Sequence, residues 1–143
     1  MTEVKKIPIW FWVVGIIALL WNGIGVAAYI GQATMSANDF GALPELQRKL
    51  LIAQPFWHSA MFPLAVLSGF LGAVMLLLRK RIAIRLFLLS LIAVLVQTAG
   101  YIILDGYFEF IGTQGWTMPV MIPVIAIGLL FFARYCENKG HLR

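Results

Sequence analysis

Four long apolar stretches constrain this chain more than any other feature of its sequence. The first, residues 8–30, contains no Asp, Glu, Lys or Arg. As a helix rising about 1.5 Å per residue it would be about 34 Å long, enough to cross a hydrocarbon core of about 30 Å. Three similar stretches follow at about residues 56–78, 82–104 and 117–135. The sequence therefore predicts an all-α membrane protein, a bundle of four transmembrane helices.

Composition supports this interpretation. The chain is 62% hydrophobic and only 12% charged, whereas soluble domains are about 25% charged. Its 143 residues leave room for one membrane domain, residues 1–143, and for no separate soluble domain. Lys5 and Lys6 resemble the start of a signal peptide, but the apolar stretch that follows exceeds the usual length of about 7–15 residues. We therefore expect an uncleaved first span.

The distribution of basic residues predicts the orientation. Arg48 and Lys49 are expected on one side of the membrane, opposite the two termini. The other nine basic residues are expected on the side of the termini: Lys5, Lys6, Arg79, Lys80, Arg81, Arg85, Arg134, Lys139 and Arg143. Because cytoplasmic segments are enriched in Lys and Arg, both termini are predicted to be cytoplasmic. Since these charges stand at span ends, we expect membrane lipids and no nucleic acid as partners.

The connections between the spans are expected to be short. Leu43, Leu46 and Leu50 recur at helical spacing, which predicts a short amphipathic helix at about residues 43–54, lying on the outer membrane surface or capping the bundle. A short acidic loop with Asp105 and Glu109 is expected to lead to the fourth span. A polar tail is expected to follow that span.

Polar residues gather in the predicted outer half of the spans, whereas the inner half is almost purely apolar. Asn22 and Tyr29 share one helical face with Gly25 and Gln32, and Gln97 shares another with Tyr101 and Asp105. A polar side chain in hydrocarbon requires a partner or water. This pattern suggests an outward-facing pocket that binds a ligand. Its candidate residues are Asn22, Tyr29, His58, Gln97, Tyr101 and Asp105. Alternatively, Asn22 and Gln97 are interhelical hydrogen-bond partners and the tyrosines are interfacial anchors.

Small residues at a spacing of four predict where helices approach closely. In the second span, Ser68 pairs with Gly72 and Gly69 pairs with Ala73. Such pairs let another helix backbone come near. Together with Gly25 of the first span, they are the candidate helix-packing residues.

Motifs of enzymes are missing from the sequence. It contains no G-x-S-x-G, H-E-x-x-H or C-x-x-C pattern and no phosphate-binding glycine loop. Its single cysteine, Cys136, excludes an intramolecular disulfide and a cysteine-based zinc site. We therefore expect no enzymatic activity, no metal site and no cofactor.

Several short motifs resemble a family of small bacterial inner-membrane proteins with four transmembrane helices, loosely labelled "sugar transporter". The motifs are Leu20-Trp21-Asn22-Gly23 with Gly25 and Tyr29, Met35-Ser36, Leu43-Pro44-Glu45, Pro55-Phe56-Trp57, Gly69-x-x-Gly72 and Leu77-Leu78-Arg79. The resemblance covers the whole chain and implies a location in the bacterial inner membrane. It brings no binding motif that could be carried over to these residues.

Two functional hypotheses follow. In the first, the chain binds or transports a small neutral or amphiphilic ligand in an outward-facing pocket, and a transport path would require a homo-oligomer. In the second, it is a structural or accessory subunit that docks on a larger membrane partner, and its polar residues hold the helices together.

Overall fold

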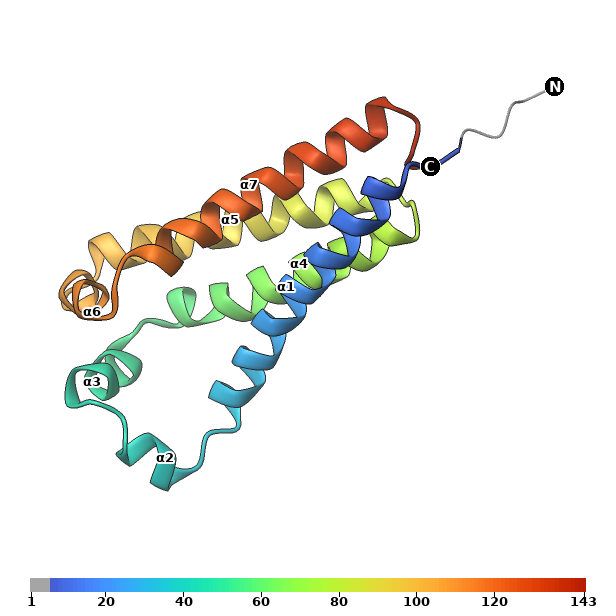
Figure 1. The fold of residues 1–143 in the computed structure, drawn as a ribbon. Coiled ribbons are helices and arrows are strands. Elements are labelled where there is room, and N and C mark those ends of the chain that lie inside the picture. Colours follow the sequence, from blue (N-terminus) through green and yellow to red (C-terminus); the bar gives the residue numbers. More distant parts are fainter. Residues whose placement is uncertain (1–5) are drawn as a thin grey trace.

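The computed structural model describes residues 6–143, which form seven helices and no strands. Four of the helices are long and apolar enough to cross a membrane: α1 (Ile9–Ala33), α4 (Phe56–Leu77), α5 (Ile82–Ile103) and α7 (Thr117–Asn138). Three are short: α2 (Ala37–Gly41), α3 (Glu45–Ala53) and α6 (Tyr107–Gln114). The chain is thus an all-α, multi-pass membrane protein with a four-helix bundle, as predicted (Figure 1).

Proline marks the start of three helices. Pro8, Pro44 and Pro55 stand directly before α1, α3 and α4, each with an extended backbone. The missing N–H of proline costs nothing there, because the first N–H groups of a helix have no partner within it. The helix predicted at residues 43–54 is α3, and the long helices begin within one residue of their predicted starts.

The long helices form a row in which α1 packs on α4, α4 on α5, and α5 on α7 (Figure 1). Small residues permit the closest contacts. A Cβ at Gly25 of α1 would come within 2.9 Å of Val66 on α4, and one at Gly72 of α4 within 2.9 Å of Phe87 on α5. Ser68, Gly69 and Ala73 are also buried in α4. All the candidate packing residues of the second span therefore face other helices.

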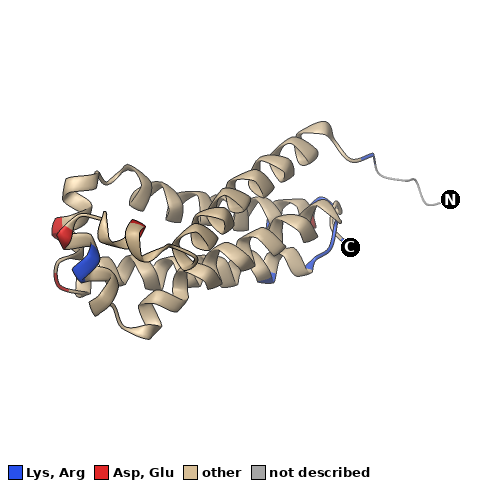
Figure 2. Cartoon of the chain, turned by 90° about the horizontal axis from the view of Figure 1, so that it is seen from below, with Lys and Arg blue, Asp and Glu red and all other residues tan. Residues whose placement is uncertain are grey.

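One end of the bundle holds the main apolar core. We call it the basic end, because Arg79 to Arg81, Lys139 and Arg143 lie there, and most blue segments of Figure 2 are at this end. Phe11, Leu76, Phe87 and Cys136 are fully buried there. The acidic residues lie mostly at the opposite end, which we call the α3–α6 end (Figure 2). Lys5 lies outside the described residues.

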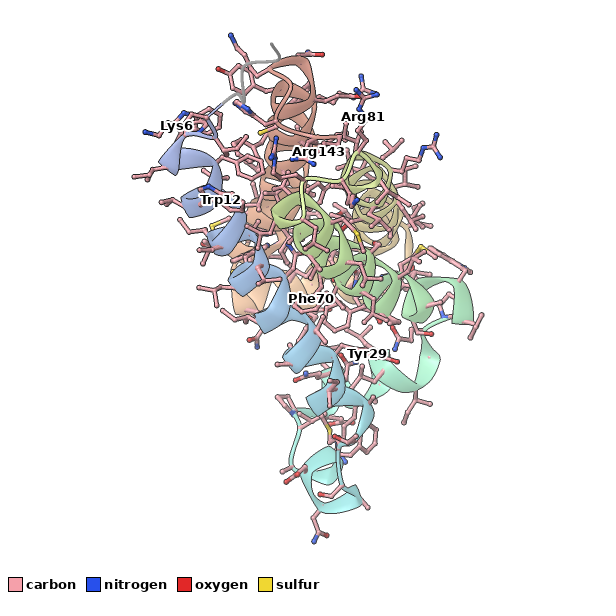
Figure 3. The ribbon with its side chains drawn as sticks, turned by 90° about the vertical axis from the view of Figure 1, so that its right-hand side faces the viewer. Lys6, Trp12, Tyr29, Phe70, Arg81 and Arg143 are labelled. Carbon is pink, nitrogen blue, oxygen red and sulfur yellow. The ribbon has the colours of Figure 1, made fainter. Side chains whose placement is uncertain are left out.

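The tail after α7 differs from the expected polar tail, because it folds back into the basic end. Leu142 is only 2% exposed and belongs to the apolar core. The backbone pairs with the turn between α4 and α5: Arg143 N–H donates to Arg79 O (2.7 Å), and Arg81 N–H donates to Arg143 O (3.0 Å; Figure 3). Arg79 Nε also donates to His141 O (2.8 Å). This pairing engages backbone groups on both sides of Leu142 and lets its side chain be buried.

A small polar cluster lies in the middle of the bundle. Asn22 is buried and donates from Nδ2 to Ala18 O in its own helix (2.8 Å). Its Oδ1 occupies the space where a side chain at Gly69 would stand. Close to Asn22, Ser90 of α5 donates to Ala65 O of α4 (2.8 Å). These bonds give Asn22 Nδ2 and the Ser90 hydroxyl acceptors within a closely packed core.

The α3–α6 end contains two short helices that the sequence did not predict. The expected acidic loop before α7 includes α6, and the connection after α1 includes α2, which Ser36 caps by accepting from Asp39 N–H (3.1 Å). Before α6 the chain turns through Gly106 with φ of 88°, a conformation that L side chains rarely adopt. A Cβ at Gly106 would also come within 3.0 Å of Leu50, so this glycine permits α3 and α6 to pack together.

Candidate functional site

An uncharged cavity of about 930 Å³ lies at the α3–α6 end of the bundle. Its walls come from the ends of all four long helices and from α3 and α6. Within residues 6–143, no Asp, Glu, Lys or Arg lines it. Instead, all five glutamines of the chain do, together with three of its four tyrosines. They are Gln32, Gln47, Gln54, Gln97, Gln114, Tyr29, Tyr101 and Tyr107.

Four of the six candidate ligand-binding residues line this cavity: Tyr29, His58, Gln97 and Tyr101. The other two lie elsewhere. Asn22 is in the polar cluster of the bundle core, where it bonds to its own helix rather than across to Gln97. Asp105 is exposed in the turn before α6 and is not part of the lining.

His58 is buried where α4 and α5 meet. A Cβ at Gly100 of α5 would overlap the imidazole ring, so the ring occupies the space that this glycine leaves. Nδ1 lies 3.2 Å from Gln54 Oε1. Because an amide oxygen only accepts, this contact assigns the proton to Nδ1. Nε2 is buried and has no hydrogen-bond partner among the described residues.

Gln54 joins His58 to the short helix α6. Its Oε1 also accepts from the Tyr107 hydroxyl (3.1 Å), which lies 3.4 Å from Leu50 O as well. The rings of His58, Tyr101 and Tyr107 pack together with centroids 5.0 to 5.7 Å apart. This aromatic wall fixes α6 and the end of α3 against the membrane helices.

Burial raises the pKa of the Tyr107 phenol above its ordinary value, because the phenolate loses hydration. The neutral phenol, which is the form that donates to Gln54, therefore persists beyond the usual pKa of about 10. The stabilisation from this bond is fully present below that pH. It is lost as the pH rises through the raised pKa of the folded protein.

Removing the Tyr107 hydroxyl tests whether its hydrogen bond to Gln54 holds α6 in place. We expect Tyr107→Phe to weaken the attachment of α6 by about 1 kcal/mol, since one hydrogen bond is lost while the ring remains. Hydrogen exchange should then become faster in α6 and α3 and stay unchanged in α4 and α5. Tyr135→Phe is the matched control, because Tyr135 packs on Trp10 at the basic end. Equal rates of hydrogen exchange in α6 and α3 in the two variants would contradict this role of the Tyr107 hydroxyl.

Sequence reasoning missed Gln47, Gln54, Gln114 and Tyr107 as cavity residues. All four lie outside the long helices, so the pattern of polar residues along a span could not identify them. One signal was present for Gln54, which precedes His58 by four residues across Pro55, a separation that brings side chains together on successive turns. Gln32 was recognised on the face of Tyr29 but was not included among the candidates.

The lining offers hydrogen-bond donors and acceptors but no ionised group. Among the described residues, no cluster of three His, Cys, Asp or Glu side chains is placed to hold a metal ion. Amide and phenol groups bind hydroxyl, amide and carbonyl groups of a ligand.

Comparisons with protein-family models, with curated proteins and with solved structures found no match.

Proposed function

We propose that this chain is a bacterial inner-membrane protein that binds a small neutral or amphiphilic ligand in a cavity facing the outside of the cell, and that it transports this ligand as a homo-oligomer. The basic end faces the cytoplasm in this proposal, which agrees with the enrichment of Lys and Arg in cytoplasmic segments. The motif resemblance supports the inner membrane as its location.

The observation that carries the proposal is the composition of the cavity lining. All five glutamines converge there, from α1, from α3 and its C-cap, from α5 and from α6, and no charged side chain of the described residues joins them. In a membrane protein, an uncompensated polar side chain is costly, so such a concentration calls for polar contents. A volume of about 930 Å³ lies within the range of about 300–1,000 Å³ found for ligand sites.

An uncharged lining favours a neutral ligand. An ion would lose its hydration on entering and would find no opposite charge in return, which costs several kcal/mol. Neutral hydroxyl and amide groups would instead exchange bonds to water for bonds to glutamine and tyrosine. The cavity is thus suited to select against ions and for uncharged polar groups.

The alternative, an accessory subunit whose polar residues hold the helices together, is supported by a different part of the molecule. Asn22 and Ser90 bond to backbone carbonyls inside the packed core, as that hypothesis expects. Among the cavity residues, Gln54 and Tyr107 also join helices through a hydrogen bond, but Gln32 and Gln97 have no such role and line open volume. We therefore assign helix packing to the central cluster and ligand binding to the α3–α6 end.

Cysteine labelling tests both the orientation and the cavity. A membrane-impermeant thiol reagent added to intact cells should modify Gln97→Cys, which lines the cavity. Ser90→Cys, two turns along the same helix and 7% exposed, should stay unmodified. The native Cys136 is fully buried and gives a low background. The wild-type chain measures that background directly.

Arg81→Cys completes the test, because the turn at the basic end should react only after the membrane is permeabilised. Labelling of Arg81→Cys in intact cells would contradict the orientation. A failure of Gln97→Cys to react in intact cells, while Arg81→Cys behaves as expected, would contradict an outward-facing, water-accessible cavity.

A further inference from the structure

We propose that the ligand is an uncharged amphiphile of the outer leaflet, such as a glycolipid, whose headgroup lies among the glutamines and whose apolar tail leaves the cavity between α1 and α7. This inference rests on the proposed ligand-binding function and narrows the class of ligand. Helices α1 and α7 are in contact at the basic end and separate toward the α3–α6 end, and the residues that line the cavity there differ in polarity.

The two edge helices of the row meet only partly. At the basic end, Trp10 of α1 packs on Phe132 and Tyr135 of α7, with ring centroids 5.7 and 5.8 Å apart. Phe11 is stacked on Phe132 as well, at 6.4 Å. From there α1 and α7 diverge along their length (Figure 1).

At the α3–α6 end, α1 and α7 become walls of the cavity. Ala28, Tyr29, Gln32 and Ala33 line it from α1, and Thr117, Met118 and Pro119 line it from the first turn of α7. Four of these side chains, Ala28, Ala33, Met118 and Pro119, are small or apolar and offer no hydrogen-bonding group. The apolar tail of the ligand would pass along these four, through the gap between the two edge helices.

The faces on either side of this gap are suited to lipid. Ile24 and Ile30 of α1 are 69% and 53% exposed, and Val120 and Val124 of α7 are 56% and 60% exposed. Large apolar side chains with such exposure belong in hydrocarbon rather than in water. The gap thus opens toward acyl chains.

The opposite side of the cavity is covered. Helices α3 and α6 pack together through Leu50 and Gly106, and the Tyr107 hydroxyl joins them to Gln54. Glu45 and Lys49 of α3 point away from the cavity, since they form an exposed ion pair (3.0 Å). The ligand would therefore enter between α1 and α7 rather than through this cover.

The polar and apolar residues of the lining match the two parts of an amphiphile. The headgroup space is built by the glutamines and by the ring wall of His58, Tyr101 and Tyr107. A second hollow of about 520 Å³ continues it, because Gln32, Met35, Leu51 and Gln54 line both. A headgroup with several hydroxyl groups fits this space, whereas a phosphate would find no cation in the lining.

Native mass spectrometry of the full chain released from phosphatidylcholine nanodiscs tests the inference. With glucosyl diacylglycerol added to the bilayer, we expect the wild-type chain to retain this lipid. Gln97→Leu should reduce the retained fraction about tenfold, the effect of about 1.4 kcal/mol in binding. Phosphatidylglycerol, the anionic probe, should not be retained.

A variant that blocks the gap between α1 and α7 distinguishes a ligand that enters from the lipid from one that enters from water. Ala28→Trp should reduce glycolipid retention about as much as Gln97→Leu, because the indole would fill the gap while the headgroup residues stay intact. Met118→Trp should act in the same way from α7. Ile30→Trp, on the opposite side of α1 from Ala28 and 53% exposed, is the matched control and should retain the lipid. Protection of the buried Cys136 thiol shows that each variant is folded.

Three results would overturn the inference. Free glucose that displaces the glycolipid, with retention unaffected by Ala28→Trp, would indicate a water-soluble ligand and leave the proposed function standing. Equal retention of phosphatidylglycerol would show that the site is not selective for uncharged headgroups. Loss of a dimer in Ala28→Trp would mean that a second copy covers the gap. The proposed function itself depends on the separate labelling of Gln97→Cys.

Discussion

Gly69→Ala is expected to destabilise the bundle by about 1–3 kcal/mol, although alanine normally favours a helix over glycine. The added Cβ would overlap Asn22 Oδ1 and lie 3.1 Å from Ser90 Oγ, so side chains of α1 and α5 both crowd it. Either Asn22 must leave its position or α1 must move away from α4. The loss should appear as a lower temperature at which a thiol-reactive dye labels the buried Cys136 on heating.

Gly128→Ala is the matched control. Gly128 lies within α7, and a Cβ there would meet nothing within 4 Å. This variant should be neutral or slightly stabilising, by up to about 1 kcal/mol, because only the helix propensity changes. If both alanine variants changed the labelling temperature of Cys136 equally, this would contradict the close contact between Gly69 and Asn22.

A double-mutant cycle isolates the contact. Asn22 donates only to Ala18 O in its own helix, so Asn22→Ala should cost little by itself, about 0.6 kcal/mol for a membrane hydrogen bond. In the Gly69→Ala background it should restore stability, since it removes the group that the new Cβ overlaps. Additive losses would mean that the two residues do not contact each other.

The fold could be predicted from the sequence because its main determinants are local. An uncharged run such as residues 8–30 specifies a membrane helix without reference to the rest of the chain. The pairs Ser68 with Gly72 and Gly69 with Ala73 likewise marked the buried faces of α4, since small residues there have only a packing role. Length, apolarity and spacing thus indicated both the spans and their closest contacts.

The site could be predicted only in part, because periodicity identifies a helical face but not what lies opposite each residue. Asn22 and Tyr29 share a face of α1, yet Asn22 meets Gly69 in the packed core and Tyr29 meets the cavity near Phe62. The difference arises from the divergence of α1 from α7, which no local pattern encodes. Gln54 and Gln114 reach the cavity from connecting segments, whose paths depend on turns such as the one at Gly106.

The tail shows the same limitation at the basic end. Leu142 is a single apolar residue between His141 and Arg143, so neither hydropathy nor spacing distinguishes it from an exposed residue. It is buried because the backbone around it pairs with Arg79 and Arg81. Arg79 adopts φ of 61°, which is uncommon for a residue other than glycine. That conformation closes the turn with which the tail pairs.

Leu142→Ala is accordingly expected to cost about 2–5 kcal/mol, the range for truncating a buried leucine. Leu142 is 2% exposed and packs in one cluster with Phe11, Leu76 and Cys136. Its truncation would leave a cavity beside the Cys136 thiol and loosen the pairing of the tail. Because each 1.4 kcal/mol changes an equilibrium about tenfold, a thiol reagent should label Cys136 at least about 30-fold faster at constant temperature.

Leu78→Ala is the control at the same end of the bundle. Leu78 follows α4 and is 58% exposed, so its truncation should leave the labelling rate of Cys136 nearly unchanged. Similar rates in the two variants would mean that the tail does not cover the core. A specific effect of Leu142→Ala would instead show that the basic end is sealed by side chains from α1, α4, α5, α7 and the tail together. The bundle would then be closed at that end while α1 and α7 stay apart at the other, which is the asymmetry on which the cavity depends.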